Sequence, residues 1–325
     1  MIKFNNLKFI NISGNKIELL NIKELWNQEV GFIFPLYEEM LLQKITECKF
    51  FSSECSFACY DEEKLVGFII SKVYDNEPVM SKYIDKGWIS LFYVSRKYRK
   101  NGIGSTLLEK AEYALKNNGV KEILFGSDYD NFFPGIPCDF FNLTERFLEK
   151  RGYLLGGYSY DVMKKMNDYQ LQEERKTEYC VRYAKITDKE EVLKFFEKNF
   201  YGRWYYEAEE FFNESFVENS YLIVLEREKV IGFLRCNKPT DIKISYNINW
   251  NKKFNKMEAY GPLGVDKDYR KLGLSRDLIV KALNDSFKNG ATDVLIDWTG
   301  LIALYQLFGF EVWKSYRHTT KIYKN

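Results

Sequence analysis

The sequence predicts an α/β protein with a mixed sheet (an α+β arrangement), built as two tandem copies of one domain. A glycine-bearing turn stands between an apolar strand and an amphipathic helix, and the same turn recurs 171 residues later. Shorter segments before and after the turn recur in the same order. The chain has 325 residues, which is enough for two ordinary domains that each bury a core.

The first copy of the turn follows an apolar strand expected at 88–94. Arg99, Gly102 and Gly104 lie in the turn, and the helix after it ends at Asn118-Gly119. Apolar residues return along that helix every three or four positions, as on one buried face. Backbone N–H groups at such a helix start have no partners within the helix, and glycine leaves room beside them. The turn therefore predicts a phosphate-binding site.

The second copy supports this reading because it repeats the first in order. The matching segments are 64–68 with 229–233, 98–102 with 269–273, and 149–153 with 306–310. The glycine pattern differs from a dinucleotide-binding fingerprint, because Gly102 and Gly104 are followed by Leu107 where the third glycine would stand. It also lacks the Gly-Lys-Ser/Thr ending of a P-loop.

In the first copy, the segment 1–24 shows weak strand signals and 24–46 reads as helical, with an interruption at 31–35. The remaining elements expected in this copy are a hairpin of 57–60 and 65–73, a strand at 122–126, a loop at 128–137, a helix at 143–150 and closing strands at 153–166.

In the second copy we expect a strand at 179–184, and then a helix that begins at Asp188 with Glu191 completing a capping box. The elements expected after it are helical segments over 204–218, a hairpin of 221–226 and 230–236, strands at 246–250, 259–265 and 294–297, a helix through 305–308 and a strand at 311–323.

The boundary between the copies is expected in a polar stretch without apolar periodicity. We predict an N-terminal domain over residues 1–168, a linker over 169–177 and a C-terminal domain over 178–325. No part of the sequence predicts an oligomeric state.

Composition narrows the classes of function. The formal net charge of +2 favours neither nucleic acid nor a membrane surface as a partner, and no apolar run approaches the roughly 18 residues of a membrane span. The first residues lack the regions of a secretory signal, so we expect a cytoplasmic protein. Six scattered cysteines and a single histidine, His318, do not predict a metal site, and the thiols are expected to be free.

The order strand, Arg-x-x-Gly-x-Gly/Ser turn, helix, strand and a last helix ending in Gly-Tyr or Gly-Phe resembles the GNAT superfamily of acyl-CoA-dependent N-acyltransferases. The resemblance covers nearly the whole chain as a tandem pair. The segments 25–27, 34–36, 132–137 and 297–299 are similar to an uncharacterised tandem subgroup, which adds little about the substrate.

The resemblance implies that acetyl-CoA is a co-substrate and that each copy has residues to hold it. The backbones of Val94 and Val265 would hold the pantetheine arm. The pyrophosphate would be held by Arg99, Lys100, Asn101, Gly102, Ile103, Gly104 and Ser105 in the first copy, and by Arg270, Lys271, Leu272, Gly273, Leu274 and Ser275 in the second. Ser275 departs from the family pattern, in which glycine or alanine is usual, but it is small and has a hydroxyl that donates a hydrogen bond.

Acyl transfer needs a neutral amine and a proton for the leaving thiolate. A primary amine of pKa about 10 is neutral in only about one molecule per thousand at pH 7. The resemblance implies a tyrosine general acid four residues before the Gly-Phe of the last helix. Tyr305 has this position in the second copy, and Leu148 has it in the first. The general base stays open, with Glu258, Asp297, Asp128 or a water relay as candidates.

The sequence therefore predicts an N-acetyltransferase that acts on a small primary amine by direct transfer, and it favours the second domain, which keeps Tyr305, as the catalyst. Direct transfer is favoured because no cysteine has a recognisable activating partner. Two alternatives stay open, an acyl-CoA sensor with degenerate domains and a scaffold whose turns only start helices. Antibiotics, polyamines, amino acids and protein N-termini all remain possible acceptors.

Overall fold

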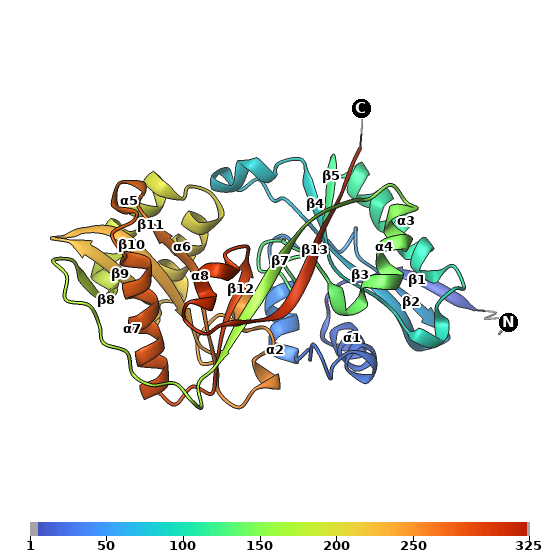
Figure 1. The fold of residues 1–325 in the computed structure, drawn as a ribbon. Helices are drawn as coiled ribbons and strands as arrows, with labels where there is room; N and C mark the ends of the chain where they lie inside the picture. The colour runs from blue at the N-terminus through green and yellow to red at the C-terminus, as the bar shows by residue number, and fades with distance from the viewer. Residues whose placement is uncertain (1–5, 324–325) are drawn as a thin grey trace. The chain divides into compact units, whose positions relative to one another are not determined.

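The computed structural model describes residues 6–323, apart from the side chains of residues 141–143. The chain divides into two compact units. The first holds the chain up to Glu77, residues 82–159 and the segment from Lys314 onwards, and the second holds residues 78–81 and 160–313. Each unit is a mixed sheet with helices packed on it, as the sequence predicts, and Figure 1 labels the elements.

The sheet of the first unit has the order β1-β2-β3-β4-β5-β13, in which β4 and β5 are parallel and the other neighbours antiparallel. The bounds of its strands are β1 Leu7–Asn11, β2 Phe57–Asp61, β3 Lys64–Val73, β4 Lys86–Val94, β5 Glu122–Phe125, the short β6 Ile136–Pro137 that pairs with β13, and β13 Glu311–Ile322.

The helices of this unit are α1 Lys16–Glu29, α2 Glu38–Leu41, α3 Ile103–Asn117 and α4 Phe141–Glu149. A π-helical turn, Leu42–Thr46, follows α2 directly, and 3-10 turns lie at Pro78–Tyr83, Arg96–Tyr98 and Cys138–Phe140. One face of α3 packs on the sheet through Leu107, Leu108 and Ala111, which are fully buried with Ile69 and Ile89. The predicted amphipathic helix therefore fixes the glycine turn against the core.

The sheet of the second unit has the order β8-β9-β10-β11-β12-β7, and β11 and β12 are its parallel pair. The bounds of its strands are β7 Leu154–Lys165, β8 Cys180–Tyr183, β9 Tyr221–Glu226, β10 Lys229–Asn237, β11 Met257–Val265 and β12 Asp293–Thr299. The helices are α5 Lys189–Asn199, α6 Arg203–Glu214, α7 Leu274–Lys288 and α8 Ile302–Gln306, and 3-10 turns lie at Ile186–Asp188, Tyr246–Ile248, Asn251–Lys253 and Lys267–Tyr269.

The last strand of each repeat contributes to the unit of the other repeat. β7 begins in the first unit, but from Tyr160 it belongs to the second, where Met163 lies opposite Leu295 of β12. β13 belongs to the first unit from Lys314, and there Thr320 lies opposite Leu124 of β5. The compact units are therefore discontinuous in sequence, unlike the continuous ranges 1–168 and 178–325 that the sequence suggests.

Three local predictions need correction. The segment 246–250 is a 3-10 turn at Tyr246–Ile248 followed by an ordinary turn, and not a strand. Its apolar–polar alternation suggested a half-buried strand, but even Asn247 and Asn249 are buried. The first helix starts at Lys16, well before residue 24, because Asn15 and Glu18 form a capping box there. The Asp188 carboxylate does not cap α5, since it accepts from the Lys185 N–H group and pairs with Arg182.

The two hairpins, both glycine turns and the helices after them are confirmed. Within residues 6–323, no helix is both long and apolar enough to cross a membrane.

Candidate functional site

The two parallel strands of the first unit separate beside the glycine turn. β4 and β5 pair from Lys86 with Glu122 to Ile89 with Phe125, and β4 then continues to Val94 without that neighbour. The register of β4 against β3 also shifts at this point, and Ser90 is the extra residue of the resulting bulge. The bulge and the separation together open the sheet next to the predicted phosphate turn.

The turn after β4 presents bare backbone at the start of α3. Gly102 is the N-cap residue, with φ of 83°, and no side chain caps the helix there. A Cβ built on Gly102 would meet no atom of the described residues within 4 Å. The first N–H groups of α3 therefore face open space at the positive end of the helix dipole, as the sequence predicts for a phosphate site.

A cavity of about 820 Å³ joins the turn to the opened sheet edge. Its lining includes the turn residues Arg99, Lys100, Gly102, Gly104 and Ser105 and the strand residues 89–94. Aromatic side chains line it too: Trp26, Phe133 and Phe140. The cavity thus combines a cationic turn with an apolar wall, which suits a molecule with a charged phosphate portion and an apolar portion.

Two guanidinium groups are fixed at this cavity. The Arg99 Nε atom donates to the Val94 carbonyl over 2.9 Å, and its guanidinium lies 5.1 Å from the ring centre of Tyr93. Arg151, just after α4, donates to the Ser105 hydroxyl and stacks 3.8 Å from the ring centre of Phe147. These contacts hold both cations where they line the cavity.

The hydroxyl of Ser90 is a further polar group of the cavity. Ser90 is 3% exposed, and its Oγ atom has no hydrogen-bond partner among the residues that the structure describes. A buried hydroxyl without a partner is costly, so such a group in a cavity wall is suited to a bound molecule. Asp139, the only carboxylate among the described lining residues, is ion-paired with Lys314.

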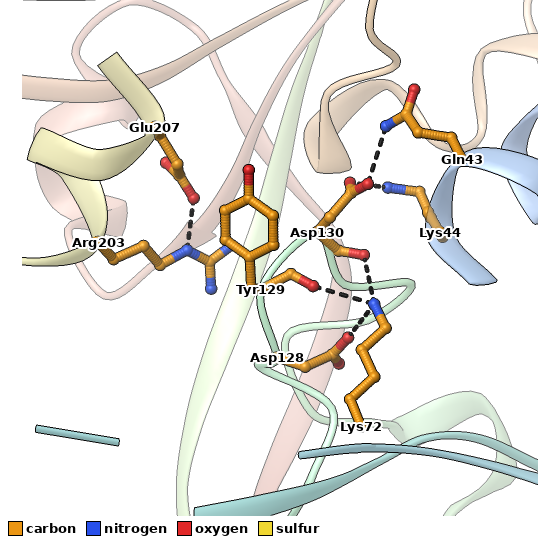
Figure 2. Close-up of polar contacts among 8 residues, drawn as sticks. All are labelled: Gln43, Lys44, Lys72, Asp128, Tyr129, Asp130, Arg203 and Glu207. Carbon is orange, nitrogen blue, oxygen red and sulfur yellow. Dashed lines mark hydrogen bonds and ion pairs between the residues drawn. The ribbon is translucent and has the colours of Figure 1, made fainter. Parts of the chain in front are cut away.

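A buried polar network anchors the loop that follows β5 and forms part of the cavity wall (Figure 2). The Lys72 ammonium contacts the Asp128 carboxylate at 2.7 Å and donates to the carbonyls of Tyr129 and Asp130 at 2.9 and 3.1 Å. Lys44, in the π-helical turn, pairs with the Asp130 carboxylate. Asp128, a candidate general base from sequence, is thus fully buried against a lysine.

The charges of this network support one another. Burial by itself would raise the pKa of Asp130, but Lys44 and then Lys72 outweigh it and hold that pKa below its usual range. Burial would lower the pKa of Lys72, but Asp128, Cys48 and Asp130 together outweigh it and raise that pKa. For Lys44, burial exceeds the attraction of Asp130 and lowers the pKa. The network has the properties of a structural clamp.

The second turn has the same backbone but different surroundings. Gly273 is the N-cap of α7 with φ of 82°, close to the value at Gly102. A Cβ built on Gly273 would lie 3.2 Å from the Arg175 Nη2 atom. Arg175 comes from the predicted linker and is ion-paired with Asp277 in the first turn of α7. The backbone prediction is therefore confirmed, whereas sequence reasoning missed the guanidinium that stands on it.

Tyr305 lies in α8 and is 6% exposed. Burial, and then the Asp297 carboxyl, raise the pKa of Tyr305 to about 12. Burial, and then Asp161, raise the pKa of Asp297 well above its usual range. In the same unit Glu258 is buried and accepts from Ser286, and Arg203 pairs with Glu207 (Figure 2). Tyr305 thus has its proton at neutral pH and lies near one of the candidate bases.

Sequence reasoning also missed cavity residues outside the glycine motif. Arg151 stands opposite Phe308 when the two copies are aligned, so a comparison of the repeats would have singled it out as a cation of the first copy alone. Trp26 belongs to the segment 25–27 that resembles the tandem subgroup, but nothing in the sequence placed it in a cavity. Phe140 carries no signal of its own, because aromatic residues make up 17% of this chain. Among the described residues, no cluster of His, Cys, Asp and Glu could hold a metal ion.

Comparison with known proteins identifies the same two regions. The model of the acetyltransferase (GNAT) family matches residues 19–133 and 187–310. N-alpha-acetyltransferase 30 of Homo sapiens is 34% identical over 77 residues, and the matched stretch is 24% of this chain and 20% of that protein. The similarity thus spans about a fifth of this relative's length. The Schizosaccharomyces pombe protein of the same name is 28% identical over 78 residues, 24% of this chain and 49% of that protein.

Solved structures share the fold over almost the whole chain. A GCN5-related glucosamine N-acetyltransferase region of a fungal multi-domain β-N-acetylglucosaminidase has a TM-score of 0.83 at 22% identity, covering 98% of this chain and 38% of that one. A tandem GNAT protein from the clavulanic acid biosynthesis pathway has a TM-score of 0.70 at 13% identity, covering 98% and 99%. At these identities the likeness concerns the fold.

The buried network makes a prediction about stability. Lys72→Met should lower the free energy of unfolding by about 3–5 kcal/mol, because it leaves the Asp128 carboxylate buried without its partner. Denaturant unfolding measures this change. Lys64→Met, at the exposed end of the same strand, is the control and should change little, and Lys72→Met with Asp128→Leu should recover most of the loss. A single variant as stable as the control would contradict the clamp.

Proposed function

Since the chain belongs to the GNAT acetyltransferase family, we propose that it transfers an acetyl group from acetyl-CoA directly to a primary amine. The observation that carries the proposal is the cavity at the first turn. There the uncapped start of α3, two fixed guanidinium groups and a separated pair of parallel strands meet in about 820 Å³. A phosphate-bearing thioester with an apolar arm fits this combination of groups.

We propose that the pyrophosphate binds the N–H groups from Gly102 to Ser105, with Arg99 and Arg151 beside it. The pantetheine arm would follow the unpaired edge of β4 from Val94 towards the bulge. The thioester would then lie near Ser90, whose buried hydroxyl lacks a partner among the described residues. The pyrophosphate, the pantetheine arm and the thioester would thus each meet a matching group in the same cavity.

In the proposed reaction the amine attacks the thioester carbon as the free base. The carbon–sulfur bond breaks, the amide bond forms, and the proton that the amine nitrogen gives up is balanced by the proton that the CoA thiolate takes up. The Ser90 hydroxyl donates a hydrogen bond to the thioester carbonyl oxygen, where negative charge develops in the transition state.

We propose that the transfer takes place in the first domain. The presence of Tyr305 in the second domain is the one observation that favours the second domain instead. The first turn is open at Gly102, and the second has Arg175 against Gly273. Leu148 at the tyrosine position of the first copy cannot donate a proton, so the thiolate would take its proton from solvent or from the attacking amine.

The acceptor is proposed only as a primary amine. The relatives' names suggest two classes for a first panel, amino sugars and peptide α-amines, to which polyamines and aminoglycosides should be added. We further propose that the chain works in the cytoplasm without a metal or nucleic acid, on the basis of its near-neutral charge and its free cysteines.

A second candidate function is an acyl-CoA sensor, and Leu148 in place of a tyrosine favours it. A sensor would bind acetyl-CoA at the same cavity but release no CoA thiol with any amine of the panel. Detection of the free thiol with a chromogenic disulfide therefore separates the two functions.

The glycine turn can be tested by adding a carboxylate to it. Gly102→Glu should weaken acetyl-CoA binding at least a hundredfold, because its charge would repel the pyrophosphate and its side chain would occupy the open N-terminus of α3. Calorimetric titration measures the affinity. Gly119→Glu is the matched control, since Gly119 also has a positive φ and open space around it but stands at the other end of α3. Equal losses in both variants would contradict the proposed site.

The role of Ser90 can be tested with a second buried serine as the control. Ser90→Ala should lower kcat about tenfold or more with little change in acetyl-CoA affinity, because it removes a donor to the developing oxyanion. Ser71→Ala removes another buried hydroxyl without a partner among the described residues, on the adjacent strand but outside the described cavity lining. Identical kcat values for the two variants would remove Ser90 from the mechanism.

Tyr305→Phe decides which domain performs the transfer. With the chemistry in the first domain, this variant should keep kcat within about twofold of the unmodified protein. A loss of a hundredfold or more, the range for a lost general acid, would place the reaction in the second domain. Steady-state kinetics with the best amine of the panel provide the measurement.

A further inference from the structure

We propose that the second glycine turn is closed to acyl-CoA by an ion pair of the chain itself. The Asp277 carboxylate takes the place of a bound phosphate at the start of α7, and the Arg175 guanidinium covers it. The inference rests on the proposed function for one point only: the first turn is taken as an open acyl-CoA site, with which the second turn is compared.

The linker runs along one side of α7 and brings Arg175 close to the second glycine turn. Tyr169 donates its hydroxyl hydrogen to the Asn284 side-chain oxygen at 2.8 Å. The Gln172 N–H group donates to the same oxygen at 3.0 Å, and the Asn284 amide donates back to the Gln172 carbonyl at 2.9 Å. Asn284 is 3% exposed. The linker is thus fixed to the C-terminal half of α7 before it reaches the helix start.

At the helix start the guanidinium makes three hydrogen bonds. Its Nε atom donates to Asp277 Oδ1 at 3.1 Å, and its Nη2 atom donates to Asp277 Oδ2 at 2.5 Å and to the Leu272 carbonyl at 2.7 Å. A Cβ on Gly273 would lie 3.2–3.3 Å from the guanidinium atoms. The side chain therefore stands on the bare glycine, where a pyrophosphate would have to approach.

The positive end of α7 and the Asp277 carboxylate both have an opposite charge beside them in the second turn. Asp277 lies in the first turn of α7 and is 8% exposed, and a negative charge there is stabilised by the helix dipole. Arg175 binds that carboxylate through two nitrogens, the strongest geometry for such a pair. An incoming diphosphate would have to displace Arg175 and then approach an uncompensated carboxylate.

The first copy differs at the corresponding positions. In the alignment that pairs Gly102 with Gly273, Thr106 stands where the second copy has Asp277. In the alignment of the last helices, the cavity cation Arg151 stands where the second copy has Phe308. At these two positions the first repeat has an uncharged threonine and an arginine, which favour a bound diphosphate. The second repeat has an aspartate and a phenylalanine there, which do not. The chain should accordingly bind one acyl-CoA.

The first experiment transfers the proposed block to the first turn. Thr106→Asp copies the carboxylate of the second turn, and Thr106→Asn is a control of nearly the same shape without the charge. By calorimetric titration with acetyl-CoA, we expect Thr106→Asp to bind at least tenfold more weakly than Thr106→Asn. Equal affinities would overturn the electrostatic part of the inference.

The second experiment opens the second turn while the first is blocked. Gly102→Glu provides the background, and Arg175→Ala with Asp277→Thr removes the pair and copies Thr106. We expect coenzyme A at millimolar concentration to bind this triple variant at least tenfold more tightly than it binds Gly102→Glu alone. Adding Gly273→Glu should abolish the gain. Thermal unfolding and circular dichroism identify variants that have kept their fold.

The outcomes separate this inference from the proposed function. A folded triple variant without any gain would overturn the inference, as would unmodified protein that binds two equivalents and loses one through Gly273→Glu. If unmodified protein binds no acetyl-CoA, the proposed function fails. In that case the comparison of coenzyme A affinity between the triple variant and Gly102→Glu still tests the inference, because the first turn is blocked in both proteins. Arg175→Lys with Asp277 retained should keep the second turn closed and provides a conservative control.

Discussion

The start of a helix that follows a parallel strand is the constraint on which this molecule depends. Its first N–H groups have no partners within the helix, and a glycine with positive φ at the N-cap leaves them uncovered. The chain contains this arrangement twice, at Gly102 and Gly273, with nearly equal backbone angles. At Gly102 the described surroundings leave the space open, and at Gly273 the Arg175 guanidinium fills it. The positive end of the helix is thus left uncovered at the first turn. At the second turn the protein's own side chains, Asp277 and Arg175, occupy it.

The cavity at the first turn depends on elements that the turn itself does not contain. The bulge at Ser90 and the separation of β4 from β5 give the cavity its length. The loop after β5, which forms part of the wall, is held by Lys72 and Lys44 through its two carboxylates and two of its carbonyls. A buried network of this kind gives position more than net stability, since the burial of its charges offsets much of their attraction. The network therefore belongs to the architecture of the cavity and not to its chemistry.

Sequence reasoning succeeded where the signal is local and periodic. The hairpins, α3, α7 and both glycine turns follow from patterns that a few consecutive residues carry. It failed where the decisive contact joins distant residues. Arg175 reads as part of a polar linker, because only the fold brings it to Asp277, 102 residues away. The segment 246–250 was wrongly predicted as a strand because its apolar and polar residues alternate as they do in a half-buried strand. In the structure its polar residues are buried as well as its apolar ones. Phe140 has no sequence signature in so aromatic a chain, and Trp26 is marked only by its place in the segment 25–27.

A repeat that binds no cofactor would still be needed for the repeat that does. The strand β13 comes from the end of the second repeat, yet from Lys314 it completes the sheet of the first unit beside β5. Tyr316 of this segment is fully buried and packs near Phe133 of the cavity wall, and Lys314 pairs with Asp139 at the cavity. Loss of the second repeat would leave the β5 edge unpaired and remove part of the core behind the cavity. The second repeat therefore contributes directly to the fold around the first site, although its own glycine turn carries an ion pair.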